Sequence, residues 1–163
     1  MDSVEKEIIV LQENLEMLRK LFGWSAEQLG NRLGVTKQTV LNLEHGKPAM
    51  SKIQYIAIRA VFETEANARE EGEKNNLLTV LNLVFNENTS ISDEKRRDAL
   101  DAAKVMANAT VSSKDKAMVT KTMTGTLAAL GIAKALIPIG GAVVAGSLTA
   151  WLAAMLKAED DKK

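Results

Sequence analysis

The 163-residue sequence contains no cysteine and only one histidine. The absence of cysteine excludes disulfide frameworks, cysteine-ligated zinc sites, iron–sulfur centres and thiol nucleophiles. Six residues are aromatic (three Phe, two Trp and one Tyr), which argues against the stacking platforms that bind single-stranded nucleic acid. There are two prolines, and Ala, Leu, Lys and Glu are abundant, so we expect helix throughout.

Motifs for catalysis and for export are also missing from the sequence. It contains no Walker loop, no dinucleotide fingerprint and no nucleophile–base set. We therefore expect a protein that is not an enzyme and that uses no metal or cofactor. The single histidine, His45, precedes a glycine at an expected helix end, where a cap or a phosphate contact is the favoured role. No basic, apolar leader opens the chain, so the expected location is cytoplasmic.

Positive and negative charges balance over the whole chain but are unevenly distributed. Lys and Arg together number 21, as do Asp and Glu. Residues 1–18 carry a net charge of −4 and residues 60–78 a net charge of −3. Between them, residues 19–59 hold seven Lys or Arg against Glu27 and Glu44, a net charge of +5. A cationic block between two anionic ones is typical of a surface that binds nucleic acid.

Local signals predict a series of short helices in the first third of the chain. Apolar residues recur at three- and four-residue steps over 8–22, which predicts one amphipathic helix ended by Gly23. A capping box at Ser25 and Gln28 begins a second helix, which Gly34 ends. Thr36 caps a third helix that runs to about residue 44.

A second capping box, formed by Ser51 and Gln54, begins a fourth helix. Its apolar residues define the side that we expect to be buried. These residues are Ile53, Ile56, Ala57, Ala60 and Val61.

The rest of the chain also has helical patterning, which gives an all-α fold class. We predict a compact domain at 1–66, a charged linker at 67–76 and a helical assembly domain at 77–163. Within the assembly domain, we expect a helix over 77–85, a turn over 86–92 and a helix from Ser92 or Asp93 to about residue 108. A helix over 113–136 and another over 142–157 form an apolar hairpin, and a charged tail follows.

The segment 25–47 reads SAEQLGNRLGVTKQTVLNLEHGK and has two short helices joined by a tight turn. It resembles the Cro and lambda-repressor type of helix-turn-helix, the XRE family. The residues that match are Leu29, Leu33, Gly34-Val35-Thr36, Gln38-Thr39-Val40, Leu43-Glu44 and Gly46-Lys47. The resemblance covers roughly residues 7–62. It implies a lambda-repressor-like domain that binds double-stranded DNA, in a regulator that we expect to be a repressor.

The resemblance also implies which side chains contact DNA. The base-facing set is Lys37, Gln38, Thr39 and Asn42. Gln and Asn amides can bond bidentately to adenine, and Lys reaches guanine or a phosphate. The candidates for contacts to the DNA backbone are Ser25, Lys47 and Lys52.

Two residues depart from the family pattern. Gly30 stands where the family usually has Ala, and Ala26 stands where relatives often have a polar phosphate ligand. A hairpin of helices that serves only for packing is the remaining alternative for this segment.

The C-terminal segment 136–156 leaves two hypotheses open. Its 21 residues carry no formal charge, so a helix of this length can span a bilayer and anchor the chain at the inner face of the membrane. Pro138, Gly140 and Gly141 interrupt it, which favours the other hypothesis, a homo-oligomer assembled through residues 77–157. Helix-turn-helix proteins usually bind two half-sites as dimers, and this also favours an oligomer.

Overall fold

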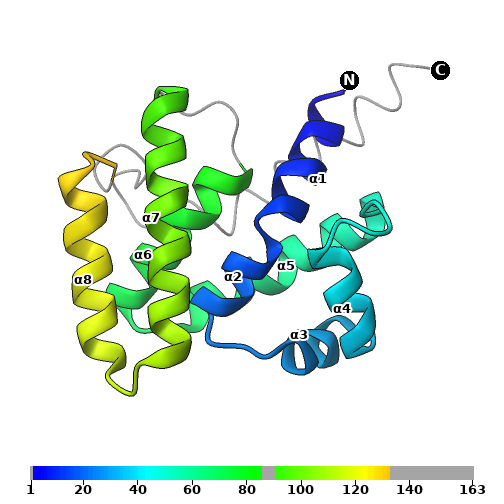
Figure 1. Cartoon of the computed structure of the whole chain (residues 1–163), viewed down its shortest axis with the longest axis horizontal. Helices are drawn as coiled ribbons and strands as arrows, with labels where there is room; N and C mark the ends of the chain where they lie inside the picture. Colours follow the sequence, from blue (N-terminus) through cyan, green and yellow to red (C-terminus); the bar gives the residue numbers. More distant parts are fainter. Residues whose placement is uncertain (1, 86–90, 133–163) are drawn as a thin grey trace.

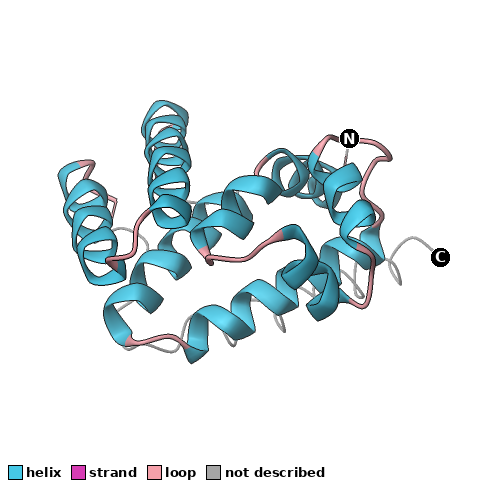
Figure 2. Ribbon diagram, turned by 60° about the horizontal axis from the view of Figure 1, so that its bottom comes forward, coloured by secondary structure: helices cyan, strands magenta, loops and turns pink. Residues whose placement is uncertain are grey.

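The computed structural model describes residues 2–85 and 91–132, and these residues form an all-α fold, as the sequence predicted (Figures 1 and 2). The described part of the chain contains eight helices and no strand. The helices are α1 (Ser3–Glu13), α2 (Leu15–Leu21), α3 (Ala26–Leu33), α4 (Lys37–Glu44), α5 (Lys52–Ala68), α6 (Glu71–Phe85), α7 (Asp93–Ser112) and α8 (Lys116–Ala129).

The helix predicted over 8–22 is two helices, α1 and α2, with a break at Asn14. The side-chain amide of Asn14 donates to the carbonyl of Val10 at 2.8 Å and so competes with the backbone ladder. The prediction of one continuous helix is therefore wrong. Its end is confirmed, because Gly23 adopts φ +74°, the left-handed conformation that terminates helices.

Helix α5 begins at its predicted capping box, but the side that faces the core differs from the prediction. Ile53 is 80% exposed, and Ala57 is also exposed. Ile56, Ala60 and Val61 are half-buried. The buried side is instead formed by Tyr55, Ile58, Arg59, Phe62, Glu63 and Ala66.

Hydrogen bonds among buried polar residues explain this rotation of α5. The Arg59 guanidinium pairs with Glu63 at 2.9 Å, and the Tyr55 hydroxyl donates to Glu7 at 2.6 Å. Burial, reinforced by this bond to Glu7, raises the pKa of Tyr55 far above its usual value. Polar side chains that satisfy one another can occupy a core position, whereas a hydrophobicity pattern assigns them to the surface.

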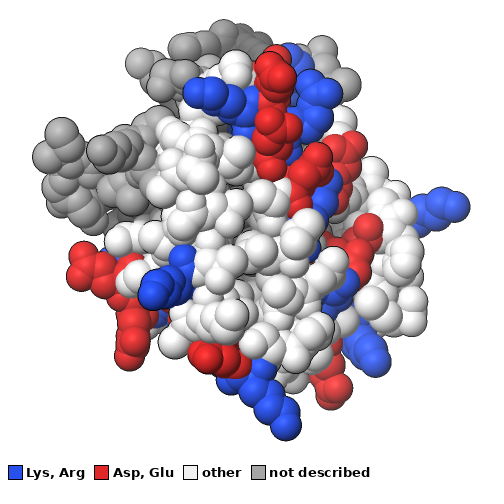
Figure 3. Space-filling view, turned by 60° about the vertical axis from the view of Figure 1, so that its left-hand side comes forward, with Lys and Arg blue, Asp and Glu red and all other residues white. Residues whose placement is uncertain are grey.

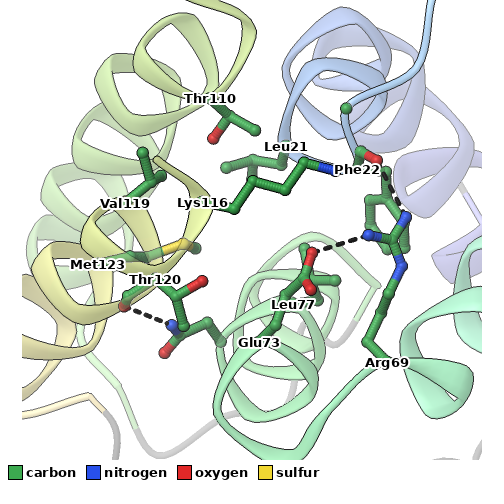
Figure 4. A pocket seen from close by; sticks show the side chains of 12 residues that line it. Leu21, Phe22, Arg69, Glu73, Leu77, Thr110, Lys116, Val119, Thr120 and Met123 are labelled. Atoms are coloured by element: carbon green, nitrogen blue, oxygen red, sulfur yellow. Dashed lines mark hydrogen bonds and ion pairs between the residues drawn. The ribbon is translucent and has the colours of Figure 1, made fainter. Parts of the chain in front are cut away.

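The predicted linker 67–76 is helical apart from Arg69 and Glu70, which separate α5 from α6. Arg69 holds this joint: it donates to the carbonyl of Phe22 at 3.0 Å and pairs with Glu73 at 2.8 Å (Figure 4). One hydrophobic core runs through the described residues on both sides of the joint, from Leu11 to Leu127. The division into domains at 1–66 and 77–163 stays a prediction.

The boundaries of α7 and α8 also differ from the predictions. Ser92 caps α7 as expected, but α7 continues to Ser112 rather than about residue 108. The helix predicted over 113–136 is the shorter α8, capped by Asp115 and ended before Gly131, which has φ +71°. The remaining C-terminal predictions lie outside the described residues: the break at Pro138, Gly140 and Gly141, the segment 136–156 and the second helix of the hairpin 113–157.

Within the described residues, no helix has both the length and the apolar character needed to cross a membrane. Helix α8 has two charged residues, Lys116 and Lys121. Viewed from the α8 side, the surface shows charges of both signs around a broad uncharged area (Figure 3).

Candidate nucleic-acid interface

Helices α3 and α4 and the turn between them are built from the predicted local signals. The Ser25 hydroxyl accepts from the Gln28 backbone N–H at 3.1 Å, and the Gln28 side chain accepts from the Ser25 N–H at 2.8 Å. Gly34 ends α3 with φ +71°. The Thr36 hydroxyl then accepts from the Thr39 N–H at 3.1 Å and begins α4. The prediction of two short capped helices is confirmed.

The close crossing of α3 and α4 explains the glycine at position 30. A Cβ atom built on Gly30 would lie 2.7 Å from the carbonyl oxygen of Val35 and 3.3 Å from the carbonyl carbon of Thr36. These neighbours are backbone atoms, so they cannot rotate away as a side chain would. Gly30 therefore permits the tight turn between α3 and α4, at some cost in helix propensity.

Helix α4 has one buried side and one exposed side. Val40 and Leu43 are buried and attach the helix to the core. Of the four predicted base-facing residues, Lys37, Gln38 and Asn42 are exposed. Thr39 is the fourth, and it is half-buried.

Two of the predicted base-facing side chains are bonded to each other. The Gln38 amide nitrogen donates to the Asn42 side-chain oxygen at 2.8 Å, which places both amides on one side of the helix. The Gln38 oxygen and the Asn42 amide nitrogen remain available, so the pair offers one acceptor and one donor group toward solvent. The Thr39 hydroxyl is engaged with the Thr36 hydroxyl at 2.9 Å and is less free than the other three.

The three predicted backbone-contacting residues lie at three helix ends. Ser25 caps α3, Lys47 follows α4 and Lys52 opens α5. Ser25 and Lys47 are exposed, and Lys52 is half-buried.

Sequence reasoning missed Gln12, which holds the segment after α4 in place. Its amide nitrogen donates to the carbonyls of Leu43 at 3.0 Å and Pro48 at 2.8 Å. Its oxygen accepts from the Met50 backbone N–H at 2.8 Å. One side chain of α1 thereby fixes the turn that carries Lys47. No motif marks Gln12, because its partners lie 31 to 38 positions along the chain.

A second missed contact attaches the end of α4 to α2. Arg19 forms a two-point ion pair with Glu44 and donates to the carbonyl of Trp24 at 2.9 Å. His45, the next residue, contacts the carbonyl of Leu41 through Nδ1 and so caps α4, one of the two roles expected for it.

These contacts change the interpretation of the cationic block at 19–59. Arg19 is paired with Glu44, and Arg59 is buried, so neither contributes to the outer surface. Lys20 pairs with Glu16 at 2.7 Å, an interaction that lowers the Glu16 pKa. Among the remaining cations of the block, Lys37 opens α4, Lys47 follows α4 and Lys52 opens α5. Arg32 of α3 lies over the Trp24 ring, at 4.1 Å from its centroid.

Comparison with known families finds one match. A family model described as Helix-turn-helix matches residues 15–64, less than a third of the chain. The matched segment begins at α2, contains α3 and α4, and ends within α5. No curated protein and no solved structure matches the chain.

Proposed function

Because residues 15–64 form a helix-turn-helix domain of the Cro and lambda-repressor type, a family of DNA-binding transcription regulators, we propose that this chain is a sequence-specific repressor. Repression would result from occlusion of the bound DNA site. The observation that carries the proposal is the exposed Gln38–Asn42 amide pair on a helix whose opposite side is anchored by buried Val40 and Leu43. A helix that served only for packing has no need of such a pair.

In this proposal α4 is the recognition helix and enters the major groove. Lys37, Gln38, Thr39 and Asn42 face the base edges there. The free acceptor of Gln38 and the free donor of Asn42 together match the N6 amino group and the N7 atom of adenine, and Lys37 reaches guanine or a phosphate. The half-buried Thr39 presents its methyl group for contact with thymine.

Ser25, Lys47 and Lys52 contact phosphates and set the position of α4 in the groove. Their placement at three helix ends suits this role, since the phosphates follow the rim of the groove. The proposed activity is binding alone, with no catalytic step and no cofactor, in the cytoplasm where the DNA is.

We further propose that the chain acts as a dimer or higher oligomer through residues 77–157. Two domains can then occupy half-sites about one helical turn apart. The membrane-associated alternative depends on the segment 136–156, which lies outside the described residues. Carbonate washing of membranes distinguishes the two: protein that stays in the pellet contradicts a soluble oligomer.

Two single variants test the division between base reading and backbone contact. We expect Gln38→Ala to lower affinity for the specific site by about 1–3 kcal/mol and to relax base preference at one position. Lys47→Ala lowers affinity for specific and scrambled duplexes alike and makes binding less sensitive to salt. Titration of both variants on both duplexes gives the answer. If the two variants behave alike on the two duplexes, the assignment is wrong.

A further inference from the structure

A narrow pocket lies where the end of α2 meets α6, α7 and α8 (Figure 4). Its enclosed cavity has a volume of about 30 Å³, room for about two water molecules. With the open mouth included, the space not filled by atoms is about 480 Å³. The walls are mainly apolar: Leu21, Phe22, Leu77 and Met123 are buried side chains, and Val119 is half-buried. A pocket of this shape suits a slim apolar group that enters from the mouth.

The buried polar group in the wall of this pocket is already satisfied. The Asn76 amide nitrogen donates to the carbonyl of Thr120 and to the hydroxyl of Thr124, each at 3.0 Å. The Asn76 side-chain oxygen accepts from the Thr124 hydroxyl at 3.1 Å. A group that enters the cavity therefore need not supply a hydrogen bond to Asn76, and an apolar group leaves no buried polar atom of that side chain without a partner.

Among the charged residues that line the pocket, Lys116 is the one without an ion pair within the described part of the chain. Arg69 is engaged by Glu65 at 3.0 Å, by Glu73 at 2.8 Å and by the carbonyl of Phe22 at 3.0 Å. In Figure 4 the Lys116 side chain extends from α8 across the pocket toward the end of α2. An ammonium group in this position can pair with an anion, and hydrogen bonds between charged groups are about twice as strong as neutral ones.

We propose that this pocket binds a small monocarboxylate with a straight apolar chain. The end of the chain fills the enclosed cavity, against Phe22, Leu77 and Met123, and the rest of it lies in the mouth. The carboxylate pairs with the Lys116 ammonium group. This inference goes beyond the proposed DNA binding and does not depend on it.

The walls of the pocket come from two parts of the chain. Leu21 and Phe22 belong to the segment that matches the helix-turn-helix family, whereas Leu77, Val119 and Met123 belong to α6 and α8. A ligand between them contacts both parts at once and binds only while they are packed together. Its binding should therefore stabilise the folded chain.

The methionines of the chain allow a direct test by nuclear magnetic resonance, with hexanoate as the probe. The full-length protein is prepared with isotopically labelled methionine methyl groups, and Met123→Leu identifies the Met123 resonance. Hexanoate should shift the Met123 methyl resonance and reach saturation, because Met123 lines the pocket. The resonances of Met50, which does not line it, and of Met118, which is 66% exposed, should not move. The absence of a saturable shift at Met123 overturns the proposal.

The length of the carboxylate tests whether its chain is buried. Each methylene group that enters the pocket should raise the affinity about two- to fourfold, so hexanoate should bind more tightly than butanoate, and butanoate more tightly than acetate. Equal affinities for the three would mean that the carboxylate pairs with a surface lysine and the pocket stays empty, which contradicts the proposal.

A matched pair of lysine variants on α8 tests the role of the charge. Lys116→Gln should lower the affinity for hexanoate several-fold and leave the affinity for hexanol unchanged, because hexanol has no carboxylate. Lys121→Gln is the control, since Lys121 is exposed on the same helix and does not line the pocket. An unchanged affinity of Lys116→Gln for hexanoate contradicts the proposal.

Filling the pocket provides a test that does not involve charge. Val119→Phe places a larger side chain in the wall, so hexanoate and hexanol should both lose their effect on the Met123 resonance. Hexanoate should also raise the melting temperature of the wild type but not that of Val119→Phe. Saturable binding of hexanoate to Val119→Phe with wild-type affinity would place the site elsewhere and overturn the proposal. Gln38→Ala should bind hexanoate as the wild type does, so failure of the DNA-binding proposal and failure of this one give different results.

Discussion

Two regions of this molecule hold their shape in different ways. The caps and the turn of the α3–α4 hairpin are formed by residues three to five positions apart, as in the Ser25–Gln28 capping box and the close approach of Gly30 to Val35. In α6, α7 and α8 they join residues far apart: Asn76 donates to the carbonyl of Thr120 at 3.0 Å, 44 positions along the chain. The turn between α3 and α4 is thus set by near neighbours. The attachment of α4 to α2 through Arg19 and Glu44, and the packing of α6, α7 and α8, depend on residues far apart in the chain.

The buried polar network of α5 lies between the two regions, so breaking it should have the largest effect on stability. Arg59 forms ion pairs with Glu63 at 2.9 Å and with Glu7 at 3.7 Å. It also donates a hydrogen bond to the Tyr55 hydroxyl at 3.1 Å. Arg59→Met would leave two buried carboxylates without this cation. We expect a loss of about 3–5 kcal/mol in the free energy of unfolding, measured by urea denaturation.

The control for Arg59→Met lies on the exposed side of the same helix. Thr64→Ala should change the free energy of unfolding by no more than about 0.5 kcal/mol. A loss below about 1 kcal/mol for Arg59→Met would show that the network does not hold α5 in its observed orientation.

A pair of glycine substitutions compares the two regions directly. Gly30→Ala forces a Cβ against the Val35 carbonyl, so we expect a loss of about 1–3 kcal/mol in the free energy of unfolding. Gly125→Ala in α8 meets no atom within 4 Å and should gain up to about 1 kcal/mol from helix propensity. Thermal unfolding measures both. Equal changes of the melting temperature, in the same direction for both variants, would contradict the tight crossing of α3 and α4.

The smallest expected effect concerns Gln12. Gln12→Ala removes three hydrogen bonds to the segment after α4, for an expected loss of about 1–2 kcal/mol in the free energy of unfolding. Because this segment carries Lys47, affinity should fall equally for specific and scrambled duplexes, measured by fluorescence anisotropy. A change in base preference would mean instead that Gln12 positions the Gln38–Asn42 pair.

The helices that were predicted well are those whose ends are marked by capping residues or by a terminating glycine. The caps at Ser25, Thr36 and Ser51 and the stop at Gly34 need only neighbouring residues, and all are present. The exposure of Gln38 and Asn42 was predicted because Val40 and Leu43 occupy the opposite, buried side of the short helix α4. The break at Asn14 was missed because Asn also occurs within helices when no side-chain bond to the backbone competes.

Elements that depend on distant partners were predicted poorly. The orientation of α5 requires Glu7, 48 positions before Tyr55, to accept a buried hydroxyl. The Arg19–Glu44 pair and the Gln12 bonds likewise join residues 25 or more positions apart. Helical periodicity and local charge do not report contacts between residues so far apart. For this reason Arg19 and Arg59 were counted with the cationic surface.

The claim that α4 discriminates base pairs is tested most directly by selecting genomic DNA fragments with the purified full-length chain. The wild-type protein and Gln38→Ala are each incubated with the same fragment pool at the same salt concentration, and the bound fragments are sequenced. The account predicts one enriched motif for the wild type and the loss of preference at one position of it for the variant. Enrichment no greater than that of the input pool for the wild type would contradict the account.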